Sequence, residues 1–116
     1  MDEDIMIAEN QGTTLILRVK IPQIDLANVG MVRKEYSKLE AGTPEFVIID
    51  MQDVNFIDSS GIGWVISVHQ QYKKQNTKLC LVSNKSELKE VFALTYIDKL
   101  IDIYDDIETA MAKGPG

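Results

Sequence analysis

The residues best suited to chemistry lie in one short stretch, where Asp58, Ser59 and Ser60 are followed by Gly61 and Gly63. The short side chains of Asp58 and Ser59 can accept hydrogen bonds from the free N–H groups of a first helical turn. Glycines lack a Cβ atom, which lets another backbone or a ligand come close. A helix N-terminus also favours an anion, so a phosphate on a serine there would be tolerated. The simpler interpretation is a helix cap and a turn.

Two flanking segments place this stretch between a strand and a helix. Residues 46–51 form a nearly unbroken β-favouring run, which is typical of a strand covered on both faces. Residues 64–72 repeat apolar groups every three or four positions, which is the period of a helix. The junction is therefore predicted at a helix N-terminus. Trp64 is expected to pack in the core, whereas Ile62, closer to the turn, is a candidate contact residue.

The first third of the chain predicts a hairpin and a helix. Residues 5–9 and 14–20 have strand character, and residues 10–12 form the expected turn between them. Asp25 is the expected N-cap of the next helix. That helix is predicted to carry its apolar side chains at helical spacing: Leu26, Val29, Val32, Tyr36 and Leu39.

The last third alternates strand and helix. Residues 78–82 predict a strand, in which the lone Cys80 is expected to be a small core residue. Asn84, with Glu87 three residues later, resembles a helix start. The helix that follows is predicted to carry Leu88, Val91, Phe92 and Leu94. Residues 100–104 predict a last strand, and residues 105–106 place negative charge at the start of a terminal helix.

The order of these elements predicts one α/β domain with a mixed sheet of about four to five strands and helices packed against it. The chain has 116 residues, enough for one core and too few for two. The domain is expected to span residues 1–112, and residues 113–116 are expected to form a flexible tail.

Charge and hydropathy exclude several classes of function. The chain has 12 Lys and Arg residues and 18 Asp and Glu residues. Its net charge of −6 opposes direct binding to nucleic acid or an anionic membrane. No apolar run approaches the roughly 20 residues needed to span a bilayer. The acidic N-terminus lacks the pattern of a signal peptide. We therefore expect a cytoplasmic protein without membrane insertion.

Enzyme chemistry finds little support in the sequence. The only histidine, His69, has no second histidine or cysteine at a metal-ligand spacing, so a structural imidazole is expected. Asp50, Asp53 and Asp58 bracket the strand end, and hard cations bind carboxylates, but their spacing does not require them to converge. Phosphate-loop and nucleophile-elbow motifs are missing. We predict no enzymatic activity, no metal site and no cofactor.

Two segments of the chain resemble a known family. Residues 56–63, Phe-Ile-Asp-Ser-Ser-Gly-Ile-Gly, look like the signature of the STAS domain family, which is shared by bacterial anti-sigma factor antagonists and the cytoplasmic ends of sulfate transporters. Residues 91–110 resemble the ending of stand-alone antagonists. The two matches lie in the right order and at the right separation. The resemblance therefore covers essentially the whole chain.

The resemblance implies a phosphorylation-controlled contact. In such antagonists, the first serine after the aspartate is phosphorylated by a partner that is both an anti-sigma factor and a serine kinase of the histidine-kinase-like ATPase class. That residue corresponds to Ser59, and Ser60 is the alternative acceptor. The unphosphorylated form captures the kinase and releases its sigma factor, and a serine phosphatase resets the switch. The implied partner-binding residues are Asp25, Asp58, Ser59, Ser60, Gly61 and Ile62.

One loop departs from the family pattern. Many antagonists carry Gly-x-Leu-Asp where this chain has Pro22-Gln23-Ile24-Asp25. The aspartate is retained, but proline fixes φ and lacks a donor N–H. We expect a stiffer loop with different backbone contacts, which bears on partner choice more than on the fold.

Two other functions remain open. The chain is alternatively a constitutive STAS scaffold subunit of a membrane assembly such as a lipid transporter, in which the serine pair is mainly architectural. A nucleotide-binding module is a third possibility. The acidic charge and the missing phosphate loop disfavour the third.

Overall fold

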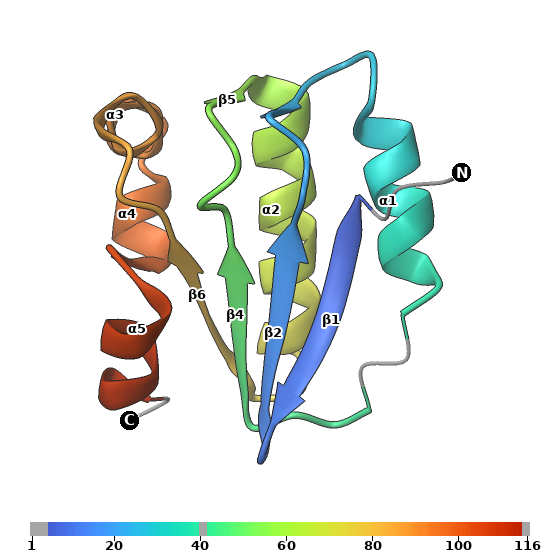
Figure 1. The fold of residues 1–116 in the computed structure, drawn as a ribbon, viewed down its shortest axis with the longest axis vertical. Coiled ribbons are helices and arrows are strands. Elements are labelled where there is room, and N and C mark those ends of the chain that lie inside the picture. Colours follow the sequence, from blue (N-terminus) through green and yellow to red (C-terminus); the bar gives the residue numbers. More distant parts are fainter. Residues whose placement is uncertain (1–4, 40–41, 115–116) are drawn as a thin grey trace.

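The chain folds around one five-stranded sheet in a computed structural model that describes residues 5–39 and 42–114 (Figure 1). The strands are β1 (Met6–Gln11), β2 (Thr14–Val19), β3 (Gln23–Ile24), β4 (Phe46–Asp50), β5 (Phe56–Ile57), β6 (Lys78–Val82) and β7 (Asp102–Tyr104). The helices are α1 (Val29–Ser37), α2 (Ser59–Lys73), α3 (Ser86–Leu94), α4 (Ile97–Leu100) and α5 (Ile107–Lys113).

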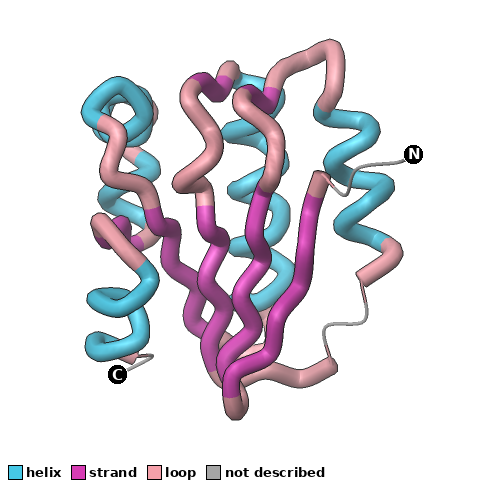
Figure 2. Tube along the Cα trace, viewed as in Figure 1, coloured by secondary structure: helices cyan, strands magenta, loops and turns pink. Residues whose placement is uncertain are grey.

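The main sheet has the strand order β1-β2-β4-β6-β7. Strands β1 and β2 form an antiparallel hairpin, whereas each of the other neighbouring pairs is parallel. Every residue of β4 is buried, as expected for an apolar strand with cover on both faces. Strands β3 and β5 form a separate two-stranded parallel sheet beyond the carboxyl end of β4 (Figure 2). The predicted α/β class and mixed sheet are confirmed.

Two cores of different size cover the two faces of the sheet. The larger core includes side chains from α1, α2, α3 and α4, whereas the smaller one lies under α5. The smaller core contains Ile16, Phe46, Ile48, Cys80, Val82 and Ala110. Burial raises the pKa of the Cys80 thiol to about 12, which keeps it protonated as a small apolar residue. The predicted core role of Cys80 is confirmed.

Helix α2 is the longest helix and packs along the larger core. Its side chains Trp64, Val65, Val68 and Tyr72 are buried at helical spacing. Trp64 is 1% exposed, which confirms the expected burial, and its ring meets that of Tyr36 from α1 edge to face at 6.0 Å. The helix therefore has a fixed position against the sheet.

The hairpin turn and the start of α1 differ from the predictions. Strand β1 extends through Gln11, which pairs with Thr14, so the turn consists of Gly12 and Thr13, and the φ of +61° at Gly12 suits glycine. Helix α1 begins after Asn28 and not after Asp25. Asp25 accepts the N–H of Asn28 at 3.1 Å and so stabilises the turn that precedes the helix.

The region after β6 also differs from the predictions. Helix α3 starts at Ser86 without a side-chain cap, because its N-cap residue is Lys85, which has no acceptor in its side chain, and Asn84 stays in the loop. Residues 97–100 are helical, so the last strand begins at Asp102. Ile97 and Ile101 share the larger core at four-residue spacing, which favours a helical turn over a strand. Leu94 is exposed and does not pack inward.

The terminal helix begins as predicted. Asp106 is its N-cap and accepts the N–H of Thr109 at 2.7 Å. Lys113, assigned to the tail from the sequence, is the last residue of α5, and residues 115–116 of that tail lie outside the described residues. Within the described part of the chain, no helix is long and apolar enough to cross a membrane.

Candidate functional site

The site is organised by the carboxylate of Asp58, the N-cap of α2. Its Oδ1 atom accepts the backbone N–H groups of Ser60 at 2.8 Å and of Gly61 at 3.2 Å. Its Oδ2 atom accepts the N–H of Leu26 at 3.0 Å. One side chain therefore satisfies two free donors of the helix and also fixes a loop that is distant in sequence.

Desolvation raises the pKa of Asp58, but the hydrogen bonds from Gly61, Leu26 and Ser60 outweigh it. The net effect is a lowered pKa, because all three donors bind the ionised form. The carboxylate therefore places a negative charge beside the first turn of α2, which itself contains no acidic residue.

Short-strand pairing joins the two loops of the site. Gln23 pairs with Phe56 and Ile24 with Ile57. The carbonyl of Pro22 accepts the N–H of Asn55 at 2.7 Å. Proline keeps its carbonyl acceptor, so its presence is compatible with this contact. The loop that departs from the family pattern thus still lies directly beside the Asp58 turn.

Gly61 has a steric role that Gly63 lacks. A Cβ atom on Gly61 would lie 2.4 Å from Cγ1 of Ile57 and 2.9 Å from both Cγ2 and the carbonyl oxygen of Ile24. On Gly63, the nearest atom would be an Arg33 side-chain nitrogen at 4.0 Å. The predicted close approach of another backbone is confirmed at Gly61. Beside Gly63 the space is open, and the approach of a ligand there stays a prediction.

The two serines differ in exposure. Ser59, the first residue of α2, is exposed, whereas Ser60 is half-buried. No hydrogen bond to the Ser59 hydroxyl is found within residues 5–39 and 42–114. A modifying enzyme would therefore reach Ser59 more readily than Ser60.

The other predicted partner-binding residues do not all reach the surface. Asp25 is half-buried, and its carboxylate accepts hydrogen bonds from Asn28 and from the Gln23 side chain at 2.8 Å. Gly61 is buried, and Ile62 is 8% exposed within the larger core. Ile62 was expected as a contact residue, but its burial in the first turn of α2 makes it a support beneath the site.

Two exposed apolar side chains at the site were not predicted. Leu26 is 78% exposed and Phe56 is 53% exposed. Leu26 was expected inside a helix, but it lies in the loop that Asp58 fixes. In β5, Ile57 faces the core, so the alternation of a strand turns Phe56 outward, and that alternation is the signal available in the sequence. We call the exposed side chains Leu26, Phe56 and Ser59, together with Asp58, the apical surface.

The acidic residues near the strand end do not converge. Asp50 pairs with Arg18 at 2.9 Å, Asp53 pairs with Lys20 at 3.2 Å, and Asp58 caps α2. Among the described residues, no group of three His, Cys, Asp or Glu side chains is placed to hold a metal ion. His69 lies on α2 beyond Trp64 and Val68, away from its N-terminal turn.

Together, these features define an α/β domain that presents an exposed serine at the capped start of a helix packed on the larger core. The family model for the STAS domain matches residues 4–110, so the chain belongs to the STAS domain family. A Thermotoga maritima protein designated an anti-sigma factor antagonist is 29% identical over 65 residues, which span 56% of this chain and 58% of that relative.

Solved structures share the whole fold. An anti-sigma-factor antagonist (STAS) domain protein from Planctomyces limnophilus has a TM-score of 0.83 and 19% identity, over 93% of this chain and 96% of that one. The antagonist SpoIIAA in its unphosphorylated form has a TM-score of 0.73 and 20% identity, over 93% of this chain and 94% of that one. The phosphorylated form of SpoIIAA from Bacillus has a TM-score of 0.66 and 19% identity, over 93% of this chain and 97% of that one. At these identities, the likeness establishes the fold.

Proposed function

We propose that this protein is an anti-sigma factor antagonist switched by phosphorylation of Ser59. The unphosphorylated form binds an anti-sigma factor that is also a serine kinase of the histidine-kinase-like ATPase class, and thereby releases a sigma factor. Phosphorylation ends that contact, and a serine phosphatase restores it. The observation that carries the proposal is the exposure of Ser59 at the capped start of α2.

The geometry supports a switch that needs no refolding. A phosphate adds close to two negative charges and three acceptor oxygens. On Ser59 it would lie next to the ionised Asp58 and near Leu26, whose backbone Asp58 binds. Asp58 already binds the N–H groups of Ser60 and Gly61, so the positive end of the α2 dipole is what helps to accommodate the phosphate within the fold. A partner that packs apolar or acidic groups on the apical surface would then meet repulsion and a desolvation cost.

Exposure favours Ser59 over Ser60 as the acceptor. The Ser60 N–H is bound by Asp58, and the Ser60 side chain is half-buried. A kinase must bring the acceptor hydroxyl in line with a γ-phosphate, which requires an accessible side chain. Incubation with the captured kinase and ATP–Mg²⁺, followed by peptide mass spectrometry, should place the phosphate on Ser59. Phosphate on Ser60 alone would contradict this assignment.

The partner is tested by capture from the lysate of the native cell. Wild type and Ser59→Ala are expected to retain the same serine kinase, whereas Ser59→Asp loses it. Ser86→Asp is the matched control, because Ser86 is also the exposed first residue of a helix. It should retain the kinase as the wild type does.

Capture of one transport complex by wild type, Ser59→Ala and Ser59→Asp alike would contradict the switch. That result would favour the constitutive scaffold. The role of Asp58 and Ser59 would then be reduced to capping α2.

A further inference from the structure

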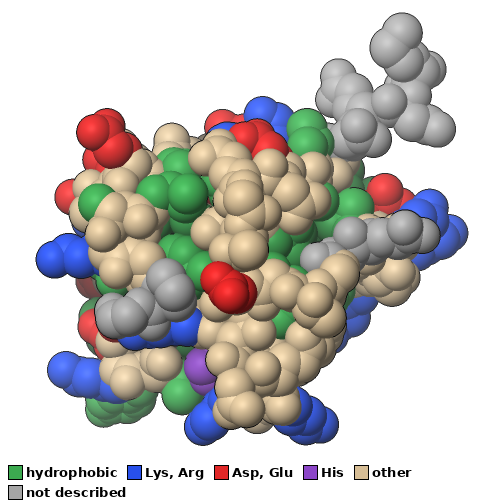
Figure 3. Space-filling view, turned by 90° about the horizontal axis from the view of Figure 1, so that it is seen from below, with side chains coloured by type: hydrophobic (Ala, Val, Ile, Leu, Met, Phe, Trp, Pro, Cys, Tyr) green, Lys and Arg blue, Asp and Glu red, His purple; other side chains and the backbone are tan. Residues whose placement is uncertain are grey.

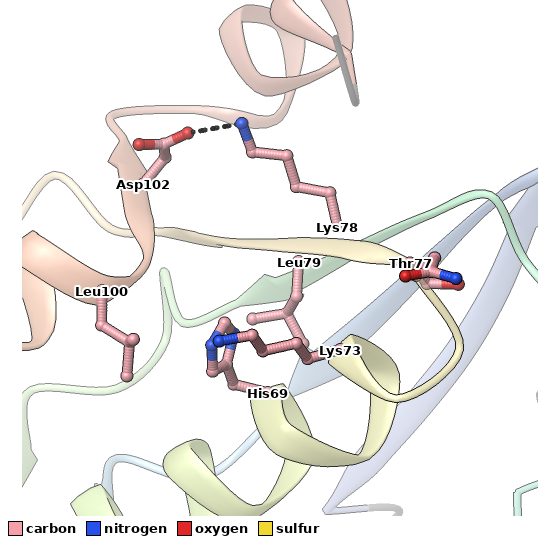
Figure 4. Close-up of a pocket in the computed structure, with 8 residues that line it drawn as sticks. His69, Lys73, Thr77, Lys78, Leu79, Leu100 and Asp102 are labelled. Carbon is pink, nitrogen blue, oxygen red and sulfur yellow. Dashed lines mark ion pairs between the residues drawn. The ribbon is translucent and has the colours of Figure 1, made fainter.

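A hollow of about 440 Å³ lies at the end of α2 opposite to Ser59. Its walls come from the last turns of α2, the turn into β6, the start of β6 and the junction of α4 with β7 (Figure 4). Its volume is in the range of small-molecule sites in proteins. From below, the histidine lies between basic side chains at this face (Figure 3).

The sheet register explains why space remains here. The ladder between β6 and β7 begins only at Cys80 and Asp102. Lys78 and Leu79, the first residues of β6, extend beyond that ladder. The space beside them is bordered by Leu100, the last residue of α4. Leu79 and Leu100 therefore give the hollow an apolar side.

Several polar groups at the hollow already have partners. Lys78 forms an ion pair with Asp102 at 3.2 Å. The Thr77 hydroxyl donates to the carbonyl of Pro44 at 3.1 Å. Lys73, by contrast, forms no ion pair within the part of the chain that the structure describes. It is therefore available to an external group.

His69 adds a second available donor. It lies one turn before Lys73, and both side chains project from α2 toward β6 (Figure 4). Its Nδ1 atom is buried and has no hydrogen-bond partner among the described residues. Since no acceptor faces Nδ1, the neutral ring is best protonated at Nε2, which is the ring nitrogen left to face a ligand.

The helix dipole offers another explanation for the basic residues at the end of α2, because cations stabilise that end of a helix. The same explanation covers Lys74. It does not account for the hollow. Turn hydrogen bonds satisfy the terminal carbonyls of α2: Gln70 accepts from Lys74, Tyr72 from Thr77, and Lys73 from Asn76. The negative end of the helix is thus largely covered.

We propose that this hollow binds a small organic anion. The Lys73 ammonium and the Nε2–H of His69 hold its carboxylate or phosphate group, while Leu79 and Leu100 contact a short apolar part. The charged side chains at the hollow are Lys73, Lys78 and Asp102, so the hollow has a net positive charge in a chain whose net charge is −6. The site is separate from Ser59, so its test needs no partner protein.

The first measurement is a chemical-shift titration of the wild-type protein by NMR. The probes are 4-methylpentanoate, inorganic phosphate and the uncharged 4-methylpentanamide. The carboxylate should shift His69, Lys73, Leu79 and Leu100 with saturation, and phosphate should shift the two basic residues. The amide should bind at least tenfold more weakly, because it lacks the charge. Equal binding of acid and amide, or shifts elsewhere, would overturn the proposal.

Matched variants test the residues. Lys73→Gln should weaken 4-methylpentanoate binding about tenfold or more, because it removes a charge-assisted hydrogen bond. Lys73→Arg should retain most of the affinity. The control Lys74→Gln removes a neighbouring charge outside the hollow and should change affinity less than about twofold. If Lys73→Gln and Lys74→Gln lost equal affinity for 4-methylpentanoate, with unchanged melting temperatures, the hollow would not be a specific binding site.

The pH dependence gives a second readout. Burial, assisted by Lys73, lowers the pKa of His69, and a bound anion opposes that effect by favouring the imidazolium. The charged groups at the hollow are Lys73 from α2, Lys78 from β6 and Asp102 from β7. Affinity for 4-methylpentanoate should therefore rise from pH 7.5 to 5.5. His69→Gln should remove this rise, and its persistence would assign the effect to another group.

Discussion

Helices α2 and α5 both begin after an aspartate that accepts hydrogen bonds from the first turn. At α2, Asp58 binds two N–H groups of the helix and also that of Leu26, which is 32 residues away. At α5, Asp106 binds the N–H of Thr109. The same local chemistry therefore serves a junction of distant segments in one case and a helix end in the other.

The residues that follow the two caps also differ in their surroundings. Ser59 follows Asp58 and is exposed, whereas Ile107 follows Asp106 and packs against the smaller core. The pKa of each aspartate is lowered, but the causes differ. For Asp106 the cause is hydrogen bonding to Thr109, whereas for Asp58 three backbone donors overcome desolvation. The surroundings of a capped helix start, and not the cap itself, decide whether it can form a site.

The largest expected effect comes from placing a charge after each cap. Ser59→Asp should weaken binding of the captured kinase by roughly a hundredfold, because the new charge must be desolvated against the partner. It should leave the fold intact, since acidic residues suit a first helical turn. Ile107→Asp should instead destabilise the fold, because it places a charge against the smaller core. Calorimetry with the kinase and thermal melting measure the two effects.

Equal kinase affinities for Ser59→Ala and Ser59→Asp would contradict the functional difference between the two helix starts. Ser59→Ala serves as the control, because it removes the hydroxyl without adding a charge. It should bind as the wild type does.

Replacing each of the two glycines of α2 by alanine should change the stability of the fold in opposite directions. Gly61→Ala should destabilise the fold by about 1–3 kcal/mol, because its Cβ would meet the backbone carbonyl of Ile24 at 2.9 Å. Gly63→Ala should stabilise the fold by about 0.5–1 kcal/mol, because alanine is the better helix former and the space is open. Urea unfolding measures both. A stabilised Gly61→Ala would show that the two loops do not pack as closely as described.

Removing each cap should test how much the long-range hydrogen bond adds. Asp58→Ala should lower the melting temperature by about 5 °C or more, because three N–H groups lose their acceptor. Asp106→Ala should cost roughly half as much, because it frees a single N–H group. Circular dichroism follows both transitions. Equal losses would show that the two additional hydrogen bonds of Asp58, including the one from Leu26, contribute nothing.

The smallest effect concerns acid stability. The pKa values of Asp58 and Asp106 are both lowered from 3.8 in the folded protein, so the unfolded state takes up protons first as the pH falls. Their stabilising effect is complete well above pH 4 and is lost as the pH drops toward the lowered pKa values. Asp58→Asn and Asp106→Asn should each reduce the fall in melting temperature between pH 5 and 3. If both variants lost as much melting temperature between pH 5 and 3 as the wild type, the two aspartates would be excluded as the cause of the acid sensitivity.

The sequence predicts more of the α2 start than of its surroundings. Capping by Asp58, burial of Trp64 and the covered β4 strand follow from residue type and periodicity over a few positions. The exposed Leu26 was wrongly placed inside a helix, because Asp25 stabilises a turn and does not cap α1. The α4 helix (Ile97–Leu100) was missed because a four-residue segment carries little periodicity of its own.

The sequence alone determined the α/β class, the strand–turn–helix junction at Asp58 and the serine pair that follows it. These depend on hydrogen bonds and side-chain periods within one or two turns, which neighbouring residues specify. The tertiary structure decided that Leu26 and Phe56 surround the site, that Ile62 lies beneath it and that Gly61 cannot be enlarged. It also brought His69 and Lys73 to a hollow with Leu100. Such contacts join segments far apart in sequence, so they depend on how the strands pair and not on local composition.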